Sequence, residues 1–69
     1  MNIDFIESKI NEILQELEKE AMHCIMNENF DKKTTNLYMK PIVSAKQILL
    51  NAIDSIKMAD KLAKEELEK

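Results

Sequence analysis

Hydrophobic residues recur every three or four positions in two long stretches of this chain, which are separated by a short polar segment. The stretches span about residues 4–28 and 37–68, and the polar segment spans about 29–36. Such spacing places the hydrophobic side chains on one face of an α-helix. We therefore predict an all-α fold in which a single domain, residues 1–69, forms an antiparallel helical hairpin.

The residues near the expected helix ends refine this prediction. Asp4, followed three residues later by Glu7, indicates a capped start for the first helix. The asparagines of the polar segment can replace glycine where a helix ends in a left-handed residue. Pro41 disfavours a helix interior, so we expect the second helix to start or break near it.

The length of the chain limits the core that a hairpin can build. The chain has 69 residues, no glycine and a single cysteine, which excludes an internal disulfide. Below roughly 70–80 residues one core rarely supplies more than about 3–5 kcal/mol. We therefore expect self-association, most simply a homodimeric four-helix bundle of the coiled-coil type. The residues expected in its core include Leu17, Ile48, Leu49, Ala52 and Ile56.

Charge is unevenly distributed along the sequence. Residues 4–28 contain seven acidic residues and two lysines, whereas residues 31–69 contain eight lysines and six acidic residues. The first helix carries an acidic stripe at i,i+4 spacing, made of Glu12, Glu16 and Glu20. Like charges at this spacing destabilise a helix. The second helix offers a basic edge that an antiparallel arrangement can set against acidic residues, made of Lys46, Lys57 and Lys64. The alternative is that the acidic stripe is solvated or forms a binding face.

The composition argues against several kinds of partner. With a net charge of −3, no arginine and few aromatic residues, the chain lacks the basic and stacking surface of a nucleic-acid-binding protein. Its longest aliphatic run, Ile48-Leu49-Leu50, is far shorter than the roughly 20 residues of a membrane span. The sequence shows no targeting pattern. We expect a cytoplasmic protein with no membrane association and no small-molecule substrate.

His23 and Cys24 are neighbours and are the single histidine and the single cysteine of the chain. Adjacent side chains on a helix point about 100° apart, so the two cannot form a nucleophile–base pair. We expect Cys24 to pack as a small hydrophobic residue and His23 to lie in solvent. The sequence therefore predicts no catalytic residue, no metal site, no cofactor and no enzymatic activity.

An alternative interpretation uses Glu20 and His23 together. Their Glu-x-x-His spacing is that of carboxylate-bridged metal sites in helical bundles, and an exposed histidine on a bundle also suits phosphotransfer. A metal-binding or phosphotransfer bundle is therefore the competing enzymatic hypothesis.

Six hydrophobic residues remain after the two helical stripes are built. We call them the turn patch; they are Met22, Met26, Phe30, Met39, Val43 and Leu50. All lie in the half of the hairpin nearest the turn, so a lone hairpin would expose them together. We predict that they bind a second chain, either another copy or a protein partner.

From these observations we expect a small acidic protein–protein interaction module. It would act as a regulator or inhibitor by occlusion or scaffolding, as antitoxin-like or phage-encoded inhibitors do. The remaining alternative is a structural subunit of a larger assembly.

Overall fold

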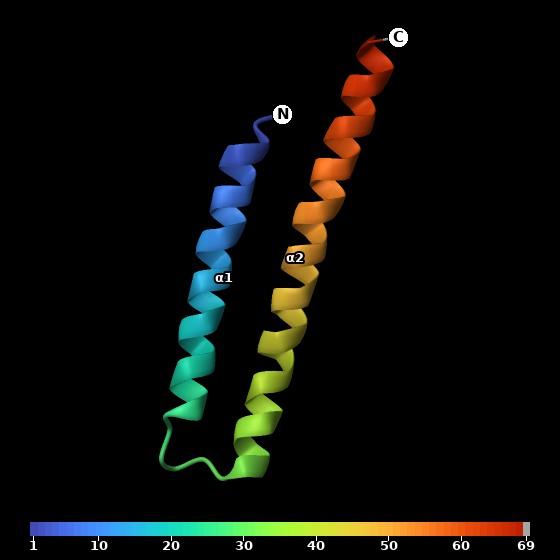
Figure 1. The fold of residues 1–69 in the computed structure, drawn as a ribbon. Helices are drawn as coiled ribbons and strands as arrows, with labels where there is room; N and C mark the ends of the chain where they lie inside the picture. Colours follow the sequence, from blue (N-terminus) through green and yellow to red (C-terminus); the bar gives the residue numbers. More distant parts are fainter. Residues whose placement is uncertain (69) are drawn as a thin grey trace.

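The computed structural model describes residues 1–68, which form two antiparallel helices joined by a short turn (Figure 1). Helix α1 spans Ile3–Ile25 and helix α2 spans Lys32–Glu68. No strand occurs in this part of the chain. The prediction of an all-α helical hairpin is confirmed.

Helix α1 begins with a cap that the sequence pattern did not identify. The side-chain oxygen of Asn2 accepts a hydrogen bond from the backbone N–H of Phe5 at 3.1 Å. Asp4 lies in the first turn, where a carboxylate favours the positive end of the helix dipole. Glu7 does not close the expected capping box; it binds Lys57 of α2 instead.

The turn is built by two side chains that accept backbone hydrogen bonds. Asn27 Oδ1 accepts from the N–H of Asn29 at 2.9 Å, and Asp31 Oδ1 accepts from the N–H of Thr34 at 2.7 Å. No residue among those described has a positive φ, so α1 ends without the left-handed residue for which an asparagine would be suited. The Asp31 cap lets α2 begin at Lys32, ahead of the position expected from the hydrophobic pattern.

Helix α2 continues through Pro41, where the sequence suggested a start or a break. A proline inside a helix removes one backbone hydrogen bond and costs roughly 3 kcal/mol. The turns that precede Pro41 gain the Asp31 cap and an aromatic contact, in which the rings of Phe30 and Tyr38 stack at 4.9 Å between centroids. These contacts favour the helix on the N-terminal side of Pro41.

Helix α2 is the longer helix, with 37 residues against 23 in α1. Its C-terminal turns therefore pass beyond the N-terminal end of α1 (Figure 1). Leu67, in these turns, is 87% exposed.

The two helices lie in a single layer. The Cα atoms extend 60 × 18 × 8 Å, and the shortest dimension leaves room for one helix only. Within the described chain, Ile53 is the one buried hydrophobic residue. Three residues expected in the core are half-buried in the seam between the helices: Leu17, Leu49 and Ile56. Ala52, also expected in the core, is half-buried at the edge of the seam. Ile48, expected in the core, is instead 66% exposed because it lies beside the seam.

The hairpin is more extended and more exposed than an ordinary small domain. Its radius of gyration is 16.9 Å, whereas a compact domain of this length has about 11 Å. Its accessible surface is 5716 Å², whereas a folded monomer of 8.0 kDa has about 4,450 Å². Two helices alone therefore leave much of their hydrophobic surface in water.

We expect the seam to depend most on Ile53. Replacing Ile53 with alanine should lower the free energy of unfolding by about 2–5 kcal/mol, because it removes buried hydrocarbon that the seam cannot replace. Urea unfolding followed by circular dichroism measures this loss. The matched control is Met58→Ala, at a position that is 56% exposed, which should change stability by less than about 0.5 kcal/mol. Equal losses for both variants would contradict the assigned seam.

The Asp31 cap should make the start of α2 sensitive to acid. Hydrogen bonds from the Thr34 hydroxyl and backbone N–H hold the pKa of the Asp31 carboxyl below its ordinary value of 3.8. The cap is therefore fully present above that value and is lost as the pH falls through the lowered pKa. The helical circular dichroism signal at 222 nm should therefore weaken as the pH falls through this pKa. The Asp31→Asn variant can still cap the helix but does not titrate, so this loss of helical signal should be absent. A loss of the same size in Asp31→Asn would show that another carboxyl causes it.

Candidate protein-interaction site

Two ion pairs between the helices define the register of the hairpin. Lys57 Nζ lies 2.9 Å from Glu7 Oε2, and Lys46 Nζ lies 3.8 Å from Glu18 Oε1. Both pairs lie on the same side of the seam, which we call the ion-pair flank. Position 7 is thus level with position 57 and position 18 with position 46, so position 12 is level with about position 52.

These ion pairs only partly agree with the predicted charge pairing. The basic edge of α2 does meet carboxylates of α1, and the hydrogen bond and charge of Glu7 raise the pKa of Lys57. Two members of the acidic stripe, however, are paired with lysines of their own helix. Glu12 lies 3.5 Å from Lys9, and Glu16 lies 3.0 Å from Lys19. Lys64 likewise binds Asp60 of its own helix at 2.9 Å, which raises the pKa of Lys64.

The structure leaves most of the turn patch in solvent. Its four outermost members are roughly half or more exposed: Met22 at 54%, Met26 at 69%, Val43 at 58% and Leu50 at 46%. Met39 and Phe30 are half-buried. Met22 and Met26 line one shallow recess with Glu18 and His23.

Three members of the turn patch, Val43, Leu50 and Met22, lie on the ion-pair flank. Val43 and Leu50 precede Lys57 by fourteen and seven residues, which are two heptads and one heptad. Met22 follows Glu18 by four residues and so lies on the same side of α1. These three residues therefore lie on the same side of the seam as the Glu18–Lys46 ion pair.

The sequence analysis missed two hydrophobic residues beside this patch. Tyr38, 56% exposed, stacks on Phe30 with an interplanar angle of 4°. Ile25, which continues the three- and four-residue hydrophobic spacing of α1, is 61% exposed because α1 ends there. The exposure of both residues depends on where α1 ends and where α2 begins. Hydrophobic periodicity locates such helix ends poorly.

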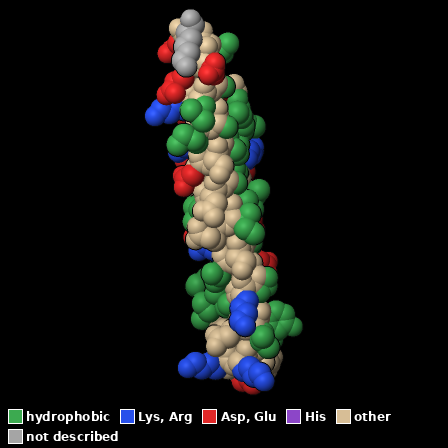
Figure 2. All heavy atoms as spheres, turned by 90° about the vertical axis from the view of Figure 1, so that its right-hand side faces the viewer, with side chains coloured by type: hydrophobic (Ala, Val, Ile, Leu, Met, Phe, Trp, Pro, Cys, Tyr) green, Lys and Arg blue, Asp and Glu red, His purple; other side chains and the backbone are tan. Residues whose placement is uncertain are grey.

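A second hydrophobic surface lies on the opposite side of the seam. We call it the open flank; its residues are Ile13 of α1 and Ile48, Ala52, Ala59 and Leu62 of α2. Ile13, Ile48 and Leu62 are 50%, 66% and 53% exposed. Figure 2, which views the hairpin from the α2 side, shows hydrophobic side chains along its right-hand edge over most of the length. Hydrophobic surface is therefore not confined to the turn.

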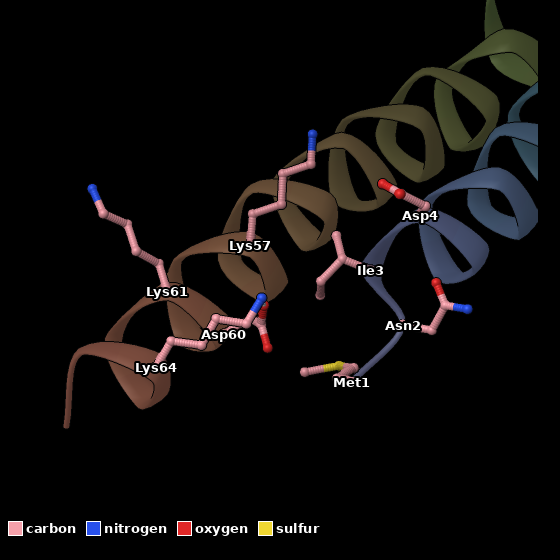
Figure 3. Close-up of a pocket in the computed structure, with 8 residues that line it drawn as sticks. All are labelled: Met1, Asn2, Ile3, Asp4, Lys57, Asp60, Lys61 and Lys64. Atoms are coloured by element: carbon pink, nitrogen blue, oxygen red, sulfur yellow. The ribbon is translucent and has the colours of Figure 1, made fainter. Parts of the chain in front are cut away.

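The open end of the hairpin holds a recess of about 410 Å³ that contains three lysines (Figure 3). Two of these lysines already bind carboxylates, Lys57 that of Glu7 and Lys64 that of Asp60. The third, Lys61, points away from Met1 and Ile3 in Figure 3. The recess is thus not arranged to hold an anion.

The residues of the enzymatic alternative do not form a cluster. Glu20 and His23 are both exposed, and Cys24 is half-buried. Among residues 1–68, no group of three or more His, Cys, Asp or Glu side chains could hold a metal ion. The described chain also contains no helix long and apolar enough to cross a membrane.

Comparison with known proteins gives no further guidance. No protein-family model, curated protein or solved structure matches the chain. The candidate site consists of the exposed hydrophobic residues of the turn patch and the open flank.

The metal hypothesis can be tested directly at His23. We expect the chain, purified without an affinity tag, to contain no stoichiometric transition metal, because Glu20 and His23 supply two ligands and a closed metal site needs about four. Elemental analysis of wild type and His23→Ala should therefore give the same result. Bound metal in wild type that is lost in His23→Ala would restore the metal-binding alternative.

Proposed function

We propose that this chain is a protein-interaction module that associates with a second copy of itself and binds another protein. It acts as a regulator or inhibitor by occlusion or scaffolding, without a reaction of its own. The observation that carries this proposal is the exposure of hydrophobic side chains on both flanks of a single-layer hairpin.

The exposed area supports self-association. The hairpin exposes about 1,300 Å² more surface than a folded monomer of 8.0 kDa. A standard protein–protein interface buries about 800 Å² on each partner. Stacking two hairpins into a four-helix bundle would supply the second layer of secondary structure that a hydrophobic core requires.

The turn patch supports binding to a different protein. Its centre is hydrophobic and contains methionines, whose flexible side chains adapt to varied partner surfaces. Its border is charged, with Lys46 and Glu18 beside it, as in an interface with a hydrophobic centre and a polar rim. A protein bound to this patch would cover the turn end of the hairpin. The surface that it uses for this contact would then be blocked for its other partners.

We propose the cytoplasm as the site of action. The single cysteine, Cys24, is a half-buried free thiol, a state that a reducing compartment preserves.

Charges placed in the turn patch should abolish binding to the protein partner. In Val43→Lys/Leu50→Lys, two unpaired lysines would lose their hydration in the interface, which is unfavourable. We expect at least a tenfold loss in the amount of partner that the immobilised chain retains from its host's lysate. The readout is quantitative mass spectrometry of the retained proteins.

The matched control adds two lysines on α1 away from the turn patch. Ser8→Lys/Asn11→Lys changes exposed polar positions and should retain the partner as wild type does. Circular dichroism should show the same helicity for all three proteins. Equal retention by the patch variant and the control, or no specific protein retained by wild type, would contradict the proposed function.

A further inference from the structure

We infer that a second copy covers the open flank, with a two-fold axis perpendicular to the helices near Ala52. Helix α2 then pairs antiparallel with α2 of the second copy, and α1 with α1. The inference rests on the proposed function in one respect, since both require a second layer of helices. It goes further by assigning the second copy to one flank and by fixing its orientation.

The choice of flank follows from where the charges lie. The ion-pair flank carries Glu7–Lys57 and Glu18–Lys46 across the seam, and a layer on that side would have to remove these charges from water. The open flank of α2 presents positions 41, 45, 48, 52, 55, 59 and 62, which are Pro, Ala, Ile, Ala, Ser, Ala and Leu. None of these residues is charged. On α2, the open flank is therefore the side that loses least by leaving water.

The spacing of these positions is that of a second helix–helix seam. They alternate between steps of four and three residues, as the seam-facing residues Leu49, Ile53 and Ile56 do. Ile48 and Leu62 supply large exposed side chains, and they alternate with alanines. Helix α2 thus has two adjacent hydrophobic faces, of which α1 covers one.

The charges along α2 determine the direction of pairing. Residues 32–53 contain four lysines and no acidic residue, whereas residues 54–68 contain five acidic residues and three lysines. A parallel pair would set like charges side by side. An antiparallel pair sets the basic half of each α2 against the acidic half of the other, which is electrostatically complementary.

The other two-fold arrangement, with its axis along the helices, fits poorly. It would set the uncharged face of α2 against the open side of α1, where Lys9, Glu16 and Glu20 lie. With the perpendicular axis, α1 lies against α1 of the second copy instead. Position 12 of α1 is level with about position 52, so Lys9 comes nearly level with Glu16 of the second copy, and each copy gains an opposite charge.

Disulfide cross-linking tests the orientation in the full-length chain with Cys24→Ala. Cysteines form a disulfide when their Cα atoms lie about 4.4–6.8 Å apart. Under mild oxidation, Ala52→Cys should form a covalent dimer, because each position 52 faces its counterpart across the axis. Ala45→Cys and Ala59→Cys should each stay uncross-linked alone, but should cross-link when mixed before oxidation. Cross-linking of Ala45→Cys alone, or none with Ala52→Cys, would overturn the inferred orientation.

Light scattering tests the flank. The wild-type mass should be twice 8.0 kDa. Ile48→Lys, on the open flank, should reduce the mass to that of one chain. Val43→Lys is the matched control, since Val43 is similarly exposed at 58% but lies on the ion-pair flank, and it should remain dimeric.

The outcomes separate this inference from the proposed function. If Val43→Lys dissociates the dimer and Ile48→Lys does not, the flank assignment is wrong while self-association stands. A wild-type mass of one chain, or of more than two, would overturn the inference and leave binding through the turn patch to be judged by its own variants. Circular dichroism on the same samples establishes that the helices remain folded, and the alanine-to-cysteine variants test the orientation without adding charge.

Discussion

Because the two helices lie in one layer, each seam-facing side chain is covered by one neighbouring helix and is open on its other sides. Among the residues that the structure describes, this geometry explains why Ile53 alone is buried, while Leu49 and Ile56 on either side of it are half-buried. Hydrophobic stabilisation is roughly proportional to the area removed from water. A single layer therefore gives few residues full burial, and the rest of the hydrophobic surface is available for contacts with other chains.

Within that layer, the charged residues select one register of α1 against α2. In a larger protein the packing of the core would have this role. Exposed ion pairs such as Glu7–Lys57 contribute little to stability. They nevertheless disfavour a slipped register, in which Glu7 and Glu18 would lose their lysine partners together. The same pairs make the two flanks chemically different. One flank has ion pairs across the seam, whereas on the other flank the α2 residues carry no charge.

Local patterns predicted the helices and their antiparallel packing, because periodicity and composition act within a few turns of chain. They failed where the answer depended on the neighbouring helix. The hydrophobic arc of α2 includes both Ile48 and Ile53, and only the position of α1 decides that Ile53 is covered. Glu7 suited a cap by its spacing, yet the register places it beside Lys57. The turn patch was recognisable as surplus hydrophobic residues, but the open flank was not, because Ile48 and Ala52 had been assigned to the core.

The extension of α2 beyond α1 has a consequence for local stability along the chain. Short isolated helices are marginal in water, and a helix is sustained mainly by the elements packed on it. The C-terminal turns around Leu67, past the end of α1, should therefore open far more often than the turns around Ile53. Local stability thus decreases from the seam toward the end of α2. Amide protons should exchange and proteases should cut first at that end, while the seam stays closed. Chain lost from that end would shorten α2 toward the length of α1 without removing the residues that hold the hairpin together.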